Sequence, residues 1–451
     1  MKKIVVSFTI VVFLVSVPIA LAKTDLAEEV KVTMKRAAIF FRSISTNGGY
    51  VGIYSFDLKE RYGEAFYEKA GKTEIWVQPP GTPSIGQCYL RAWRVTGDKY
   101  YLDATRDVAK ALVWGQREIG GWDHRVDVGH LEPNKTVPIR RKGRCTFDDD
   151  ITQGALKFLI DADSVLDEAW LTDAIELGLR FMQKSQFDNG AWPQWYPLRG
   201  GYSDHYTYND HAINDCIEVM LKAHAAYGRP EYLASAEKGG EFIIISQLPK
   251  PQAGWAQQYS HDMKPAWARS FEPPGVCSAV TANNIRILVQ LYIYTKKDKY
   301  LSPIPAAIEW LERSKISHNL WARLYEVGTN RPIYGDRMDG NKVHYEYEKV
   351  SQKERSSYGW QGEYGIAGAI SQYRRHKAAG NDGVRPVKQN EMLKERRIQR
   401  AGNLEPSIKR IIGALDSEGR WVTNNVITCQ TFVSYFMTLC NYLVLQNPSK
   451  P

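Results

Sequence analysis

The sequence predicts an all-α protein made of repeated helical hairpins, which stack into an α-solenoid or close into an α/α toroid. Five tryptophans follow short turns, each after a long segment with helical apolar periodicity, and the first three intervals between them are 70, 63 and 66 residues. Such an interval holds two helices of about 15 to 20 residues and their loops. A short polar turn, such as TGDKYYL, GRPEYL or KKDKYL, divides the segment into two helices. The repeating tryptophans are Trp122, Trp192, Trp255, Trp321 and Trp421.

The first 22 residues are interpreted as a secretory signal peptide. MKKIVVSFTIVVFLVSVPIALA has two lysines, an apolar run and the small residues Ala20-Leu21-Ala22 before Lys23. The apolar run is short for a membrane span, which makes an uncleaved anchor the weaker alternative. We therefore expect a protein that is exported to the periplasm or the medium and is free of the membrane after cleavage.

The remaining chain is expected to form one catalytic unit, with an N-terminal helical part at 23–75 and the repeats at 76–451. Residues 327–405 interrupt the repeat, and short strands near 333–348 and a solvated helix near 389–401 are expected there. The apolar segment 429–446 is expected to complete the last hairpin. The four complete hairpins are expected over 88–116, 155–186, 216–247 and 284–314.

The net charge of the chain is positive, at +9. A basic exported protein suits an anionic ligand through electrostatic steering, although solubility explains the charge equally well. The six cysteines are scattered through a chain long enough to fold without disulfide bonds, and no C-x-x-C motif occurs. We expect neither disulfide pairing nor a zinc site.

Two acidic clusters lie at the starts of predicted helices. One is Asp148-Asp149-Asp150 in TFDDDIT, and the other is the run GYSDHYTYNDHAIND, which contains Asp210. A single aspartate at such a position usually caps the helix. Adjacent carboxylates, however, repel one another unless a cation or a substrate group lies between them. Because carboxylate and amide oxygens suit calcium better than zinc or copper, a calcium site built from separate loops is the candidate function.

Arginines gather in other loops beside aromatic residues. Surface exposure or ion pairing explains most arginines, but the triplet WAR occurs at both 267–269 and 321–323. We expect these two loops to present guanidinium groups to the same cavity. The arginines concerned are Arg269, Arg323, Arg331, Arg337 and Arg355.

The run QFDNGAWPQWYPLRGGYSDHYTYNDHAIND resembles the core motif of family 10 polysaccharide lyases, the pectate lyases with an α/α-toroid fold. TFDDDIT, WARSFE, WARLYE, NRPIYGDR and ERSSYGWQGEYG follow in the family's order, so the resemblance covers roughly residues 85–445. It implies an incomplete α/α toroid whose irregular loops and short strands form a substrate groove. It also implies calcium-assisted β-elimination on the acidic polysaccharide polygalacturonate.

The resemblance assigns roles to individual residues. It places groups that bind Ca2+ or bridge to substrate at Asp148 or Asp149 and at Asp210, and it makes Arg269 the base. FDDDITQG departs from the family's continuation, so the choice between Asp148 and Asp149 stays open. The residues implied to bind substrate are Arg199, His205, Tyr208, Arg323, Arg331, Arg337, Arg355 and Tyr358.

An arginine base is chemically demanding because almost no free arginine is neutral at ordinary pH. Burial beside calcium and other guanidinium groups would lower its pKa. By their pKa, His205 and His211 would be easier bases. The alternatives to a lyase are a toroid glycoside hydrolase, a non-catalytic protein that binds an acidic polysaccharide, and an enzyme like a terpenoid cyclase. We expect a monomer that binds no nucleic acid.

Overall fold

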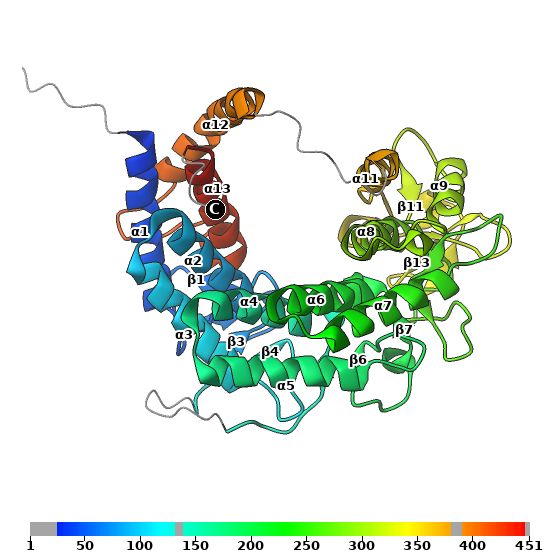
Figure 1. Cartoon of the computed structure of the whole chain (residues 1–451), viewed down its shortest axis with the longest axis horizontal. Coiled ribbons are helices and arrows are strands. Elements are labelled where there is room, and N and C mark those ends of the chain that lie inside the picture. The colour runs from blue at the N-terminus through cyan, green and yellow to red at the C-terminus, as the bar shows by residue number, and fades with distance from the viewer. Residues whose placement is uncertain (1–24, 131–138, 380–389, 447–451) are drawn as a thin grey trace, which may run out of the picture.

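The computed structural model describes residues 25–130, 139–379 and 390–446, so the expected signal peptide lies outside the described residues. The helices form an open arc of two layers (Figure 1), which confirms the incomplete α/α toroid. Each inner helix packs against the next along the arc. In that order the inner helices are α13 (Cys429–Gln446), α2 (Thr82–Thr96), α4 (Ile151–Leu166), α6 (Ala212–Tyr227), α8 (Ser278–Thr295) and α11 (Ile366–Ala379). The outer helices are α1 (Leu26–Ser43), α12 (Asn390–Gly413), α3 (Lys99–Gly115), α5 (Ala169–Ser185), α7 (Pro230–Ile245) and α9 (Ile304–Arg313).

The hairpins turn where left-handed backbone ends the inner helix. Gly97 (φ 76°) ends α2 and Gly228 (φ 67°) ends α6, and glycine tolerates this conformation without steric cost. Asp167 and Lys296 take the same role after α4 and α8. Asp98 then caps α3 by accepting a backbone hydrogen bond of 2.9 Å. The short turns predicted from the sequence are therefore the hairpin turns of the structure.

The repeating tryptophans share one structural role. All five are buried, and each indole Nε1 donates to a backbone carbonyl oxygen near the end of the outer helix that precedes it. The last carbonyls of a helix have no partner within the helix, so the indole satisfies one of them and anchors the following loop. The bonds run from Trp122 to Leu112 (2.8 Å), Trp192 to Met182 (2.8 Å), Trp255 to Ile243 (2.6 Å), Trp321 to Leu311 (2.7 Å) and Trp421 to Ile411 (3.0 Å).

Short antiparallel strands join the loops that connect one hairpin to the next. Because each hairpin returns the chain to the same end, these loops all gather there, and the strands hold them together. The largest sheet has the order β14-β13-β12-β10-β8, with β14 (Lys342–His344), β13 (Pro332–Asp336), β12 (Leu324–Tyr325), β10 (Val276–Cys277) and β8 (Trp255–Ala256). The other pairs are β5 (Cys145–Thr146) with β6 (Trp195–Tyr196), β7 (Tyr206–Thr207) with β9 (Gln258–Tyr259), and β11 (Trp321–Ala322) with β15 (Gln361–Gly362).

The N-terminal part is only partly helical, which corrects the prediction for 23–75. After α1 the chain forms β1 (Ile53–Ser55), β2 (Arg61–Tyr62) and β3 (Glu74–Trp76), and β3 pairs with β4 (Arg125–Asp127). Strand β1 pairs with β16 (Val426–Thr428), with Ile53 opposite Thr428. The two ends of the described chain therefore share a sheet. Local periodicity does not predict such a pairing, because the partner strand lies almost the whole chain away.

The interruption at 327–405 contains the expected short strands, β13 and β14. It also contains the one-turn helix η5 (Tyr347–Lys349) and the short helix α10 (Gln352–Ser357). The helix expected near 389–401 is the first part of α12, which packs against α13. All six cysteines are buried and free. Among the described residues, no helix has the length and apolar character needed to cross a membrane.

Candidate active site

Two equivalent turns carry the acidic residues. Each is a one-turn helix directly before an inner helix: η1 (Asp148–Asp150) precedes α4, and η3 (Asn209–His211) precedes α6. Both follow a threonine whose hydroxyl accepts the first backbone N–H of the turn, at 3.0 Å from Thr146 and 3.1 Å from Thr207. Asp149 and Asp210 therefore hold the same position in neighbouring repeats, as the TFDD and TYND sequences indicate.

The backbone of both turns is left-handed at two successive residues. In η1 these are Asp149 (φ 50°) and Asp150 (φ 55°), and in η3 they are Asp210 (φ 44°) and His211 (φ 66°). A non-glycine residue in this conformation costs roughly 1 kcal/mol of folding free energy. The repetition of this conformation at the acidic positions of two repeats indicates that it orients their carboxylates.

The carboxylates lie close enough to repel one another. Burial, and next the charge of Asp210, raises the pKa of Asp148 to about 6. Burial, together with the charges of Asp148 and Asp210, raises the pKa of Asp149 to about 7. The Oδ1 atom of Asp148 is buried and has no hydrogen-bond partner among the described residues. A cation between these carboxylates would offset the repulsion and occupy the unpaired oxygen.

His124 joins the acidic pair, and the sequence argument missed it. It lies in the loop two residues after Trp122, and one ring nitrogen of His124 lies within 4.8 Å of carboxylate oxygens of Asp148 and Asp149. Burial alone would lower the pKa of His124, but the hydrogen bond and charge of Asp123 raise it above its usual value. The only signal in the sequence is the position of His124 in a repeat loop.

The donor set of this acidic site fits calcium. Its carboxylates supply the hard oxygen ligands that Ca2+ prefers, and Asn209 and Gln194 each add a buried amide oxygen without a hydrogen-bond partner among the described residues. Gln194 also donates to Asp148 Oδ2 at 2.8 Å, which holds that carboxylate in place. Thiolate ligands, which zinc often uses, are not part of the group.

A half-buried lysine, Lys157, connects the two acidic turns. Lys157 Nζ on α4 lies 3.1 Å from Asp150 Oδ1, 2.8 Å from Asp215 Oδ1 and 3.3 Å from Glu218 Oε2. Burial alone would lower the pKa of Lys157, but the three carboxylates raise it above its usual value. The ion pairs tie η1 to α6, so Asp150 and Asp215 have a structural role beside the metal candidates.

Three arginines converge on one aromatic side chain, Tyr358. The guanidinium carbons of Arg269, Arg323 and Arg337 lie 5.9, 5.1 and 5.7 Å from the centre of its ring. Arg269 and Arg337 also lie over the ring of Phe271, at 4.9 and 4.7 Å. The two WAR loops thus bring Arg269 and Arg323 to the same aromatic ring. This arginine cluster offers several cations to an anionic ligand.

Glu272 organises the arginine cluster, and the sequence argument gave it no role. Arg269 Nε donates to Glu272 Oε2 at 2.8 Å, and Arg269 Nη2 donates to Oε1 at 2.9 Å. Tyr358 donates to the same carboxylate at 2.5 Å and Gln257 at 3.2 Å. Burial alone would raise the pKa of Glu272, but Arg269 lowers it below its usual value. The carboxylate thus fixes Arg269 against Tyr358.

The acidic site and the arginine cluster are neighbours. The hydrogen bonds of Glu272 raise the pKa of Arg269 above its usual value, against the effect of burial, and the charge of Asp210 acts in the same direction. The charge of Arg269 in turn opposes the rise in the pKa of Asp148. Gln257 connects the two regions: its backbone carbonyl accepts from the N–H of Tyr208, two residues before Asp210, at 3.0 Å, and its side-chain oxygen accepts from Arg323 Nε at 3.3 Å.

Gly335 on β13 allows the loop with Arg269 to pack closely. A Cβ atom at this position would lie 1.7 Å from the carbonyl oxygen of Phe271, so any larger residue would displace that loop. Next in the chain, Asp336 is fully buried and accepts hydrogen bonds from the backbone N–H of Ser351 (2.6 Å) and of Met338 (2.9 Å). These contacts connect β13 to the segment that carries Tyr358.

Three arginines expected to bind substrate make no contact with the arginine cluster among the described residues. Arg331 pairs with Glu326 at 3.1 Å and lies over Tyr345 on the surface. Arg355 lies near Tyr347. Arg199 is exposed in the loop before η2 (Tyr202–Asp204).

The remaining expected residues lie away from the acidic site or beneath it. Tyr208 differs most from the prediction: its side chain is 1% exposed, and its hydroxyl lies 2.7 Å from Ser246 Oγ, so it packs in the core under η3. His205 contacts Gln258 at 3.3 Å, and burial, together with His261, lowers its pKa. Nothing in their local sequence distinguishes these positions from those that reach the site.

Comparisons with known proteins identify a family and similar folds. A model of the pectic acid lyase family matches residues 116–319 and 313–367, more than half of the chain. No curated protein sequence matches. Family 10 polysaccharide lyase from Cellvibrio cellulosa is similar in structure, with 21% identity over 64% of this chain and 97% of that chain and a TM-score of 0.50. A mutant of the Cellvibrio enzyme in complex with trigalacturonic acid matches with 20% identity over 66% and 98% and a TM-score of 0.50.

A third solved structure extends the likeness of fold along the chain. A family 76 glycoside hydrolase from a bovine Bacteroides thetaiotaomicron strain covers 94% of this chain and 79% of its own, with 9% identity and a TM-score of 0.50. At these identities the likenesses describe the fold, and the family match carries the assignment. The chain belongs to the pectic acid lyase family and is a polysaccharide lyase.

Proposed function

We propose that this polysaccharide lyase is an exported pectate lyase that cleaves polygalacturonate by calcium-assisted β-elimination and releases unsaturated oligogalacturonides. The observation that carries the proposal is that η3, the turn with Asp210, packs against η1 with Asp148 and Asp149 and is joined through Gln257 to Arg323 of the arginine cluster. A uronide polymer needs both environments, because its carboxylates must be bound and the charge that develops at one of them must be stabilised.

The arginine cluster suits a polymer with regularly spaced carboxylates. Arg323 and Arg337 can each hold a uronate through paired N–H groups, and Tyr358 between them offers an aromatic face to a sugar ring. Arg337 is itself anchored, since its Nε donates to the buried Glu354 at 2.8 Å. Arg331, Arg355 and Arg199 would belong to outer parts of the groove.

Asp148, Asp149 and Asp210 would hold the calcium ion, with His124 beside them. The bound ion would act as a Lewis acid that withdraws charge from the uronate next to the reacting carbon. The chain's own contribution is the left-handed pair of turns, which brings the carboxylates together and keeps them partly free of hydrogen bonds.

In the elimination the C5–H bond breaks and its proton passes to a base. The electron pair forms the C4–C5 double bond as the C4–O bond breaks, and the leaving oxygen takes up a proton. We propose Arg269 as the base. Its Nη1 atom makes no hydrogen bond within the described structure, while Nε and Nη2 are held by Glu272. Arg269 can accept the C5 proton only when its guanidinium group is neutral. Because Glu272 raises the pKa of Arg269, its contact with Arg269 must weaken when substrate binds.

The first test incubates the protein with polygalacturonate in calcium or in chelator and follows the ultraviolet absorbance of unsaturated uronide. Reducing ends without that absorbance would indicate hydrolysis and contradict the proposal. When the full-length chain is expressed, the protein found in the periplasm or medium should lack residues 1–22, and N-terminal sequencing would show this. Size-exclusion chromatography tests the expectation of a monomer.

The role of Arg269 is tested by two substitutions. Arg269→Ala should lower kcat by a factor on the order of 10² to 10⁴, as expected for loss of a general base. Arg269→Lys should keep part of the activity and shift the pH profile toward lower pH, because an amine has the lower pKa. Arg229→Ala on the outer layer is the control. A rise in KM with unchanged kcat in Arg269→Ala would show that Arg269 binds substrate without removing the proton.

A further inference from the structure

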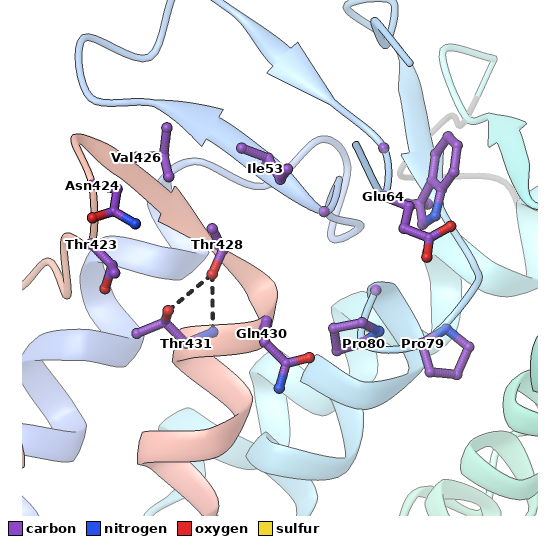
Figure 2. A pocket seen from close by; sticks show the side chains of 14 residues that line it. Ile53, Glu64, Pro79, Pro80, Thr423, Asn424, Val426, Thr428, Gln430 and Thr431 are labelled. Carbon is purple, nitrogen blue, oxygen red and sulfur yellow. Dashed lines mark hydrogen bonds between the residues drawn. The ribbon is translucent and has the colours of Figure 1, made fainter. Parts of the chain in front are cut away.

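A cavity lies outside the segment that the family model matches. It has a volume of about 430 Å³, is open to solvent, and is lined by residues from 52–81 on one side and 423–431 on the other (Figure 2). It therefore occupies the seam where β1 and β16 join the two ends of the described chain. The volume and the largely apolar wall, with a few polar groups, are typical of a small-molecule site.

Close packing of glycine backbone shapes this seam pocket. A Cβ atom on Gly63 would lie 2.3 Å from the ring of Trp76, and one on Gly52 would lie 2.1 Å from the carbonyl oxygen of Gly63. Trp76 is 5% exposed and lines the cavity. The glycines thus let the tryptophan lie against the backbone, and the small exposed part of its side chain lines the cavity.

The polar groups of the seam pocket are almost all uncharged. Glu64 is the one ionisable side chain among the described lining residues, and no lysine, arginine or histidine contributes. The opposite side carries hydroxyl and amide groups, and Figure 2 shows Asn424, Thr428 and Gln430 there, across from Glu64. Without a cation, and with a carboxylate at its edge, the seam pocket disfavours an ionised uronate and suits hydroxyl-rich uncharged groups.

The seam pocket is connected to the acidic site through one side chain. Gln78 Nε2 lies 3.3 Å from Glu64 Oε2 in the pocket and 3.1 Å from Asp149 Oδ2 in the site. The seam pocket and the acidic site are therefore separated by a single side chain, and one polymer bound at Asp149 can reach both.

We infer that the seam pocket is a distal subsite for an uncharged pyranose of the same polymer, either a methyl-esterified uronic acid or a neutral sugar. The inference rests on the proposed function for the substrate class. It adds that the enzyme distinguishes polymers with interspersed uncharged residues from the fully ionised homopolymer, and that the N- and C-terminal parts of the chain make this distinction.

The test uses Gln430→Arg, which removes an amide from the seam pocket and adds a cation. Asn441→Arg is the matched control: it places the same charge on an exposed position of α13, eleven residues and roughly 16 Å farther along the helix. For each protein, kcat/KM is measured on partly methyl-esterified polymer and on the same polymer after saponification. A third substrate, a saponified polymer with neutral sugars in its backbone, separates the two sources of an uncharged residue.

For Gln430→Arg, kcat/KM on the esterified polymer divided by kcat/KM on the saponified polymer should be about fivefold lower than for the wild type. This factor corresponds to the loss of one net hydrogen bond. Asn441→Arg should leave the ratio unchanged, and thermal unfolding checks that both variants fold. Equal ratios in Gln430→Arg and Asn441→Arg on every polymer would overturn the inference.

A binding measurement keeps this outcome separate from the proposed function. Calorimetry in chelator with short esterified oligomers should show weaker binding to Gln430→Arg than to Asn441→Arg. Should the wild type cleave none of the polymers, the proposed function fails, and the calorimetric difference still decides whether the seam pocket binds uncharged sugar.

Discussion

Replacing Asp148 by asparagine should stabilise the calcium-free protein while it weakens calcium binding. Asparagine keeps the shape of the side chain and can still accept the hydrogen bond from Gln194. It removes the negative charge that burial and Asp210 make unfavourable. The charge of Asp148 is thus predicted to lower the folding stability of the calcium-free protein and to strengthen calcium binding.

The magnitude follows from the pKa of Asp148, which rises from 3.8 to about 6 in the folded protein. At 1.36 kcal/mol for each pKa unit this corresponds to about 3 kcal/mol. Because the pKa is raised by folding, the folded protein binds more protons than the unfolded chain between these values. Stability therefore falls as pH rises through this range, and the full cost is present above pH 6.

Urea unfolding in chelator measures this effect at pH 8 and near pH 4. At pH 8, Asp148→Asn should be more stable than the wild type by up to about 3 kcal/mol, and near pH 4 the difference should largely disappear. Calcium at a hundred times its Kd should then stabilise the wild type by about 2.7 kcal/mol and the variant by much less. Asp339→Asn, which removes an exposed ion pair with Lys342, should change stability by less than about 1 kcal/mol in each condition.

Two results would refute this reasoning. Lower stability of Asp148→Asn than of the wild type in chelator at pH 8 would mean that the carboxylate is stabilised in the folded protein. Equal stabilisation of both proteins by calcium would place the ion elsewhere.

Three further substitutions test the supporting structure. Lys157→Met should cost about 1 to 3 kcal/mol in urea unfolding, because it leaves half-buried carboxylates without their cation, and an unchanged stability would contradict that role. Gly335→Ala should lower kcat in the lyase assay more than tenfold by displacing the Phe271 carbonyl, whereas unchanged kinetics would show that the loop adapts. Asp336→Asn should cost about 1 to 3 kcal/mol at pH 7. Since hydrogen bonds outweigh burial and lower the pKa of Asp336, the wild type should lose this advantage as pH falls below about 4, and a difference independent of pH would contradict the assignment.

The repeat could be predicted because its determinants are local. Helical periodicity, the polar turns and the returning tryptophans all lie within single hairpins, and the structure adds that each indole caps the preceding outer helix. The similarity of TFDD and TYND also lies in the sequence, and it places Asp149 and Asp210 at equivalent positions. The same reasoning could not separate Tyr208, which is buried in the core, from Tyr358, which lies among the arginines.

The sequence by itself determined the all-α repeat, the family and the acidic and basic residue types of the active site, because these depend on short-range patterns and motifs. Only the tertiary structure decided which residues meet. His124 joins the aspartates, Glu272 holds Arg269, and strand β1 closes on β16 to form the seam pocket. Each of these contacts depends on how separate loops or distant strands pack together, and no local sequence pattern specifies which distant segments come into contact.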